Sequence, residues 1–209
     1  MSLPPIWKVK REIGRVGDQA RRLTSKLYEI PVRANHNRWL TNVAQPLPGK
    51  RILGNKVAIV VLFQPKGVAA SVFLMCDHLI SQGYSPFILS NGPLSDGDRF
   101  ALLEKSALLL VRPNFGCDFG AYQDGIRLLD RIGCKLDTLI IMNDSTWFPL
   151  RANDTSIARM EASTDAFTGH ILRNEPDIRR GQAHIDSHLL MFKKTTFESA
   201  SFRDFWSSY

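Results

Sequence analysis

Residues 56–63 read KVAIVVLF, an uninterrupted apolar run that follows Lys56 and gives way to the polar Gln64. A strand with one face in water would alternate apolar and polar side chains, and this run does not, so both faces of the strand are predicted to be buried. Three later runs have the same character: PFILS at 86–90, ALLLV at 107–111 and TLIIM at 138–142. Together the four runs predict the central strands of one sheet.

Segments of helix length separate these runs, near residues 68–82, 97–105 and 119–132. Alternation of strand and helix is typical of an α/β fold, in which a mostly parallel, Rossmann-like sheet carries helices on both faces. Residues 56–209 are therefore predicted to form one α/β domain.

Polar residues follow each predicted strand, where a parallel sheet of this kind binds its ligands. The candidates for a shared binding crevice are Gln64, Asn91, Arg112, Asn114, Gly116, Asp118, Asn143, Asp144 and Ser145. No GxGxxG follows the first strand and no GxxxxGK[ST] occurs in the chain. The sequence therefore disfavours both a dinucleotide-binding dehydrogenase and a P-loop nucleotidase.

Asp144 is the candidate metal ligand, because the buried strand TLIIM leads directly into Asn143, Asp144 and Ser145. Mg²⁺ is often held by one or two carboxylates together with the phosphates of the substrate, so one aspartate suffices for a Mg²⁺ or Mn²⁺ ion on a nucleoside diphosphate. The alternative is a turn or a helix N-cap, which favours the same three residue types.

The stretch RPNFGCDFGAY, residues 112–122, is the second candidate element. Gly116 permits close approach of the backbone, Asn114 and Asp118 can bind base, ribose or sugar hydroxyls, and Arg112 can pair with a phosphate. A capped turn between strand and helix remains the alternative.

The third element is GQAHIDSHLLMFKK, residues 181–194, in which LLMF predicts another strand. His184, Asp186 and His188 have alternate spacing, which places them on one side of an extended chain. They are candidates for a metal ligand or for the general base that activates an acceptor hydroxyl. Ordinary, partly buried histidines are the alternative.

Basic charge is concentrated before the first strand: residues 1–56 hold 12 Lys and Arg against 3 Asp and Glu, and residues 57–209 hold 15 against 17. Apolar residues recur between 6 and 30 at the spacing of an amphipathic helix, which Pro31 is predicted to end. Such a helix can pack on its own domain, on a partner helix or on an anionic membrane surface. With an irregular linker over 31–55, residues 1–55 form a predicted N-terminal region, and no recognisable nucleic-acid-binding module occurs in it.

The cysteines and the apolar segments bear on location. Cys76, Cys117 and Cys134 are odd in number and lack metal-binding spacing, which favours a reducing compartment. No signal peptide and no apolar run of membrane-spanning length is found. The expected location is the cytoplasm.

The motifs KVAIVVLF, RPNFGCDFGAYQDGI, LIIMNDSTWFPL and HIDSHLLMFKKTTFESASFRDFW, in this order, resemble the rhamnan synthesis F family over about residues 56–206. The resemblance implies a GT-A-type glycosyltransferase of lipopolysaccharide or capsule assembly. It implies a nucleoside diphosphate sugar as donor, with dTDP-rhamnose a candidate, and a growing glycan or lipid-linked acceptor at the inner face of the plasma membrane.

By position, the resemblance places Asp144 in the metal motif, Asn114 and Asp118 along the donor, and His184 near the acceptor or diphosphate. Asp186 is the candidate base, although an amide-type residue is expected there. Relatives usually continue beyond Tyr209, so a C-terminally truncated domain is expected. The alternative function is a noncatalytic nucleotide-sugar-binding or scaffold module tethered by its basic helix.

Overall fold

The computed structural model describes residues 30–173 and 184–208, and the chain divides into two compact units, residues 1–44 and 45–209. In the first unit, residues 30–42 are helical. The prediction of an irregular linker over 31–55 is wrong for residues 31–42, because proline is tolerated in the first turn of a helix and the residues after it can still form helix. The prediction that Pro31 ends the helix over 6–30 cannot be followed in the described residues. The amphipathic pattern predicted for residues 6–30 falls, except for Ile30, outside the described residues.

The second unit is built on a seven-stranded sheet with the strand order β1-β4-β3-β2-β5-β9-β6. Its strands are β1 (Leu47–Pro48), β2 (Lys56–Leu62), β3 (Ser85–Ser90), β4 (Leu108–Val111), β5 (Thr138–Asn143), β6 (Phe167–Gly169) and β9 (Leu189–Lys193). The four central strands β4, β3, β2 and β5 run parallel, whereas β1, β9 and β6 pair antiparallel at the edges. A separate two-stranded sheet pairs β7 (Leu172–Arg173) with β8 (His184–Ile185).

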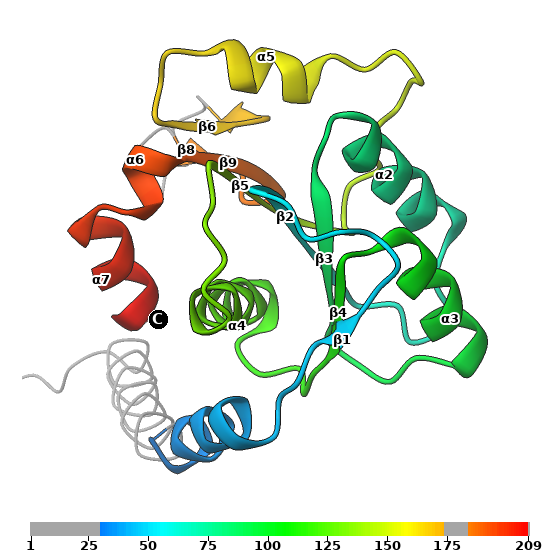
Figure 1. Cartoon of the computed structure of the whole chain (residues 1–209), viewed down its shortest axis with the longest axis vertical. Helices are drawn as coiled ribbons and strands as arrows, with labels where there is room; N and C mark the ends of the chain where they lie inside the picture. Colours follow the sequence, from blue (N-terminus) through cyan, green and yellow to red (C-terminus); the bar gives the residue numbers. More distant parts are fainter. Residues whose placement is uncertain (1–29, 174–183, 209) are drawn as a thin grey trace, which may run out of the picture. The chain divides into compact units, whose positions relative to one another are not determined.

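Helices cover both faces of the large sheet (Figure 1). They are α2 (Ala70–Ser81), α3 (Asp96–Lys105), α4 (Cys117–Arg131), α5 (Ser156–Ala162), α6 (Lys194–Phe197) and α7 (Ala200–Ser208). Figure 1 shows α2 and α3 on one face and α4 on the other. The predicted α/β class, with a mostly parallel sheet between helices, is confirmed.

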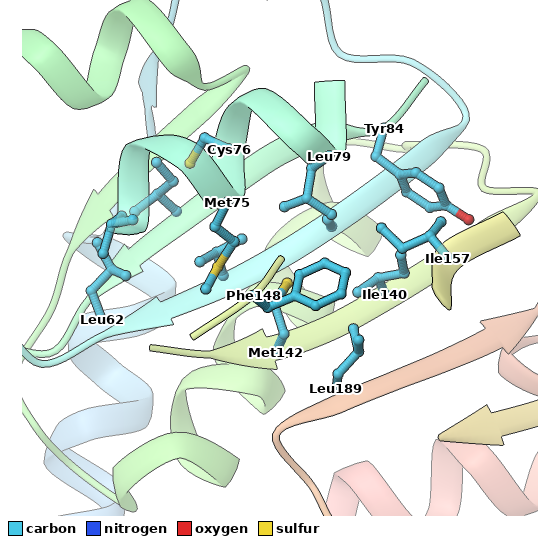
Figure 2. Close-up of a cluster of buried hydrophobic side chains, with 14 of the residues drawn as sticks. Leu62, Met75, Cys76, Leu79, Tyr84, Ile140, Met142, Phe148, Ile157 and Leu189 are labelled. Atoms are coloured by element: carbon cyan, nitrogen blue, oxygen red, sulfur yellow. The ribbon is translucent and has the colours of Figure 1, made fainter. Parts of the chain in front are cut away.

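A hydrophobic core lies between α2 and the sheet. Figure 2 shows Met75 and Leu79 of α2 above the strand residues Ile140 and Met142, with Phe148 among them. The same cluster includes alternate residues of β2, namely Ala58, Val60 and Leu62. Because successive side chains of a strand point to opposite faces, the intervening residues of β2 must be buried by α4.

Contacts on the α4 face confirm this arrangement. Val57, Ile59 and Val61 have no exposed surface. A Cβ atom added at Gly125 of α4 would lie 2.9 Å from Cδ1 of Ile59, so the helix packs directly on the strand. Both faces of β2 are therefore buried, as its continuous apolar run predicted. No helix in the described ranges 30–173 and 184–208 is both long and apolar enough to cross a bilayer.

Candidate functional site

The candidate site lies where the carboxyl ends of β2 and β5 meet. From β2 the chain passes through α2 to β3 on one side, while β5, reached through α4 on the opposite face, pairs on the other side. The strand order reverses at this point, which is where sheets of this kind usually bind their ligands. The topology therefore directs attention to the residues that follow Leu62 and Asn143.

Asp144 joins these two strand ends. Its backbone N–H donates to the Val61 carbonyl at 3.1 Å, which extends the pairing of β5 with β2. Its Oδ2 accepts hydrogen bonds from the Phe63 backbone N–H at 3.1 Å and from Nε2 of Gln64 at 2.7 Å. The Gln64 amide is itself oriented, because its Oε1 accepts a hydrogen bond from the Ala69 N–H at the start of α2, at 3.3 Å. The carboxylate is thus held by two donors from the segment that follows β2.

Asp118 enters the same region from the first turn of α4. Its Oδ2 accepts a hydrogen bond of 2.7 Å from Nδ2 of Asn143, the residue before Asp144. The other end of the Asn143 side chain, Oδ1, accepts a 2.7 Å hydrogen bond from the Ser145 hydroxyl. Since Asn143 is only 7% exposed, its amide links Asp118 to the end of β5. Neither carboxylate carries a lysine or arginine partner among the described residues.

Tyr122, one helical turn after Asp118, reports the electrostatics of the site. Its side chain is buried, and its hydroxyl donates to the Ser187 carbonyl at 3.3 Å. Burial raises the pKa of this phenol, and the negative charges of Asp118 and Asp144 raise it further. The prediction that Asn114, Asp118 and Asp144 meet at one rim stays a prediction. The described hydrogen bonds place Asp118 next to Asn143, the residue before Asp144.

Arg112 lies beneath the site instead of lining it. The guanidinium is 2% exposed and donates to Oδ2 of Asp124 at 2.8 Å, to Oδ1 of Asn91 and to the Phe115 carbonyl at 2.7 Å. Burial lowers the pKa of Arg112, and the charge of Asp124 opposes this shift. The predicted phosphate contact of Arg112 is corrected accordingly, because all three nitrogens bind protein groups that hold the loop after β4. Asn91, 3% exposed, belongs to the same buried network.

The loop before α4 has an unusual backbone. Gly116 and Cys117 have positive φ angles of 69° and 49°, a conformation that glycine adopts readily and cysteine rarely. A Cβ atom at Gly120 would lie 2.3 Å from the Phe115 carbonyl oxygen, so only glycine fits there. Asn114 is exposed in this loop, and no hydrogen bond in the described ranges joins its side chain to Asp118 or Asp144.

The third predicted element is not continuous. β8 ends at Ile185 and a turn follows, so His184, Asp186 and His188 do not share one side of a strand as predicted. His184 and Asp186 approach one another, with Nε2 and Oδ1 3.8 Å apart. His188 is buried instead, and its Nε2 lies 3.2 Å from Nδ1 of His170.

The turn after β8 still contacts the site through its backbone. Tyr122 donates to the carbonyl of Ser187, and the Asn143 N–H donates to the carbonyl of His188 at 3.2 Å. Asp186 is the residue immediately before Ser187 in this turn.

The structure thus joins five predicted site residues through the end of β5: Gln64, Asp118, Asn143, Asp144 and Ser145. Sequence reasoning missed the hydroxyl of Tyr122 and the backbone N–H of Phe63. The spacing of Tyr122 four residues after Asp118 on a predicted helix was a usable signal for the first, because such residues lie on one helix face. The role of Phe63 depends on the backbone alone, so its residue type gave no signal.

Comparisons with known proteins bear on the whole chain. An uncharacterised protein, y4gN, of Sinorhizobium fredii (strain NBRC 101917 / NGR234) is 31% identical over 199 residues, which cover 95% of this chain and 52% of the relative. The chain therefore spans about half the length of this curated relative. Among solved structures, a mannosyltransferase, PcManGT from Pyrobaculum calidifontis in complex with GDP-Man and Mn²⁺, aligns with a TM-score of 0.45 at 14% identity, covering 86% of this chain and 56% of that chain.

A family model gives the assignment. The model described as Rhamnan synthesis protein F matches residues 87–209, more than half of the chain. The matched region begins within β3 and contains the Arg112 loop, Asp118, the end of β5 with Asp144, and the turn after β8. By this match, which agrees with the resemblance noted in its motifs, the chain belongs to the rhamnan synthesis protein F family.

Proposed function

We propose that the chain carries the donor-binding region of a glycosyltransferase that moves a sugar from a nucleoside diphosphate to a growing cell-surface glycan. The family supports this general role. The single observation that carries the proposal is that Asp118 accepts a hydrogen bond from Asn143, the residue before Asp144, so that both carboxylates lie at the end of β5. Rhamnose, as in dTDP-rhamnose, is the first sugar to test, because rhamnan is a polymer of it.

The site fits a hard divalent cation that is shared with the substrate. Both described hydrogen bonds to Asp144 end on Oδ2, and the one to Asp118 ends on a single oxygen, so each carboxylate keeps an oxygen for a further ligand. Within the described ranges no cluster of three or more His, Cys, Asp or Glu could hold a metal by itself. Two carboxylates suit Mg²⁺ or Mn²⁺, which keep several waters and take oxygens from a diphosphate. Such an ion would stabilise the charge on the departing diphosphate.

The remaining residues have distinct roles in the proposal. Gln64 and Asn143 hold the two carboxylates in place, and Ser145 is available at the exposed rim to bind a donor hydroxyl or phosphate. Asn114 and the backbone at Gly116 border the donor from the α4 loop. Asp186 accepts the proton of the acceptor hydroxyl. The oxygen of that hydroxyl attacks the anomeric carbon of the donor sugar, and the bond from that carbon to the diphosphate breaks. His184, 3.8 Å from Asp186, orients or assists this base.

Thermal unfolding in the presence of ligands tests the proposal. The full chain is melted with Mn²⁺ alone, with each of several nucleoside diphosphate sugars alone, and with both together. We expect stabilisation that requires both, since a ligand at 100 times its dissociation constant adds about 2.7 kcal/mol to the free energy of unfolding. Asp144→Asn and Asp118→Asn should abolish it, because each removes a charge while keeping the shape of the side chain.

Asp130→Asn is the matched control, because Asp130 is exposed at the far end of α4. It should be stabilised as much as the unchanged chain. Equal stabilisation of Asp144→Asn would remove Asp144 from the metal site. Slow hydrolysis of the bound donor would then separate an enzyme from a noncatalytic binding module, which would bind the donor and leave it intact.

A further inference from the structure

Two histidine side chains meet next to the end of β6, and the proposed function gives this pair no role. Nδ1 of His170 lies 3.2 Å from Nε2 of His188, and the planes of the two rings are inclined by 75°. The chain contains five histidines, and these two are 18 residues apart in the sequence. The sequence predicted His188 as a candidate metal ligand, and the fold adds a partner that the sequence did not indicate.

The backbone on both sides of this pair is held by hydrogen bonds. His170 directly follows β6, and its N–H donates to the Leu189 carbonyl at 3.1 Å, which continues the pairing of β6 with β9. The carbonyl of His188 accepts a hydrogen bond of 3.2 Å from the N–H of Asn143 at the end of β5. The two histidines are therefore positioned before any ligand binds, which lowers the entropic cost of binding.

Neighbouring side chains also fix the two rings. His188 is only 9% exposed. The ring of His170 packs edge-on against the buried Phe148, with 5.9 Å between the ring centroids. Nε2 of His170 lies 3.4 Å from Oγ of Ser156, and a proton on Nε2 that is donated to this hydroxyl leaves the Nδ1 lone pair directed at His188. Histidines that bind metals commonly use their second nitrogen in this way, to bond a protein group that orients the ring.

The distance between the two facing nitrogens suits a bound cation. Zn²⁺ binds imidazole nitrogens at about 2.0–2.1 Å in tetrahedral geometry, so two such nitrogens lie about 3.3–3.4 Å apart. The 3.2 Å between His170 and His188 is close to this spacing. Without a cation, the same contact is a hydrogen bond in which one of the two nitrogens carries a proton. Within residues 30–173 and 184–208, no third His, Cys, Asp or Glu completes the pair, so water would fill the remaining positions.

We propose that His170 and His188 together bind a transition-metal ion, with Zn²⁺ the first to test. Imidazole nitrogens suit Zn²⁺, Ni²⁺ and Cu²⁺, whereas carboxylate oxygens such as those of Asp118 and Asp144 suit Mg²⁺ and Mn²⁺. The two sites therefore select different cations. An ion at the histidine pair links the end of β6 to the turn before β9 and stabilises this edge of the sheet. This role is independent of the proposed glycosyltransferase function.

The test titrates ZnCl₂ into the full chain, without an affinity tag and without donor, and follows binding by calorimetry. CoCl₂ is a second probe, because its visible absorption reports nitrogen ligands. We expect the unchanged chain to bind Zn²⁺ and His170→Asn to bind it at least about tenfold more weakly, since even the loss of a group that orients a ligand costs about 10–100-fold in affinity. His170 is exposed, so this variant should fold normally. His188→Asn should lose the same binding, and Ser156→Ala should lose less.

His184→Asn and Cys117→Ser are the matched controls, because each removes another exposed side chain that can bind Zn²⁺. Both should bind Zn²⁺ like the unchanged chain. Equal Zn²⁺ affinity in His170→Asn and the unchanged chain would overturn the proposal, and so would failure of the unchanged chain to bind Zn²⁺.

Asp144→Asn separates this site from the donor site. It should bind Zn²⁺ like the unchanged chain, while His170→Asn should keep the stabilisation by Mn²⁺ and nucleotide sugar. If Asp144→Asn loses Zn²⁺ binding together with His170→Asn, one cation is shared by both sets of residues and the separate site is overturned. If Zn²⁺ binding depends on His170 and no donor stabilisation is found, the glycosyltransferase proposal fails and the histidine site stands.

Discussion

At the scale of single residues, the orientation of Asp144 is set by Phe63 and Gln64, in the segment that follows β2. The Gln64 amide cannot rotate freely, because its Oε1 is bound to the N–H at the start of α2 and its Nε2 is then presented to the carboxylate. The Phe63 N–H ends on the same oxygen. The site is thus arranged before a ligand arrives.

His78 gives a prediction about pH at the same scale. It is 8% exposed, its Nε2 has no hydrogen-bond partner in the described part of the chain, and burial lowers its pKa from 6.5 against the opposing charge of Asp154. A histidine with a lowered pKa takes up a proton on unfolding, so the free energy of unfolding should be largest above pH 6.5 and fall as the pH drops below it. Urea unfolding of the unchanged chain and of His78→Leu, from pH 5 to 8, measures this.

We expect His78→Leu to show a shallower fall below pH 6.5, because the buried imidazole is gone. At pH 8, where the imidazole is neutral in both folded and unfolded chains, the substitution should leave the free energy of unfolding unchanged or raise it by up to about 3 kcal/mol, because a buried nitrogen without a partner carries a desolvation cost of that order. Parallel pH curves for the two proteins would assign the dependence to another group.

At the scale of elements, α4 connects the core to the site. Gly125 allows the helix to pack on Ile59 of β2, and Gly120 allows the Phe115 carbonyl to approach the helix while it accepts from Arg112. The same first turns carry Asp118 and Tyr122. Gly120 and Gly125 therefore determine how closely α4 packs on the sheet, and with it the position of the Asp118 carboxylate.

Gly120→Ala should disturb both stability and donor binding. The added methyl group would lie 2.3 Å from the Phe115 carbonyl oxygen, so the loop before α4 must shift. We expect a loss of about 1–3 kcal/mol in the free energy of unfolding, as for other overpacked sites, and a smaller stabilisation by Mn²⁺ with nucleotide sugar. Gly97→Ala in α3 is the control, because the nearest atom lies 4.0 Å away and alanine favours helix. A Gly120→Ala protein as stable as the Gly97→Ala protein would show that the loop yields without cost.

Elements could be predicted from the sequence where a pattern of residues has only one structural explanation. The apolar runs in β2 and β5 lack alternation because both faces are covered, and this could be predicted. The pairing of β1 with β4 could not be predicted, because β1 consists only of Leu47 and Pro48 and such a short strand leaves no pattern in the sequence. Nor could the turn after β8, since His184, Asp186 and His188 have the same spacing in a strand and in a broken one. The interpretation of Arg112 as a phosphate ligand is wrong for a similar reason. Its buried partner, Asp124, lies on the following helix, and only the fold brings the two side chains together.

At the scale of the whole molecule, the two compact units differ in net charge. Residues 1–44 contain 9 Lys and Arg against 3 Asp and Glu, and residues 45–209 contain 18 against 17. The candidate site lies wholly in the second unit. We expect the excess positive charge of the first unit to favour binding to an anionic membrane surface.

Removal of residues 1–44 should abolish binding to an anionic membrane surface and leave the stabilisation by Mn²⁺ and nucleotide sugar intact. The full chain should sediment with phosphatidylglycerol vesicles at low salt and dissociate as salt is added, because each Lys or Arg near an anionic surface contributes about 1 kcal/mol and salt screens exposed charges. Neutral phosphatidylcholine vesicles are the control and should retain little protein. The shortened chain should lose this binding yet keep the stabilisation by Mn²⁺ and nucleotide sugar, since Asp118, Asp144 and Tyr122 all remain. Equal sedimentation of both chains would place the membrane contact in the second unit, and loss of donor stabilisation would show that the first unit supports the site.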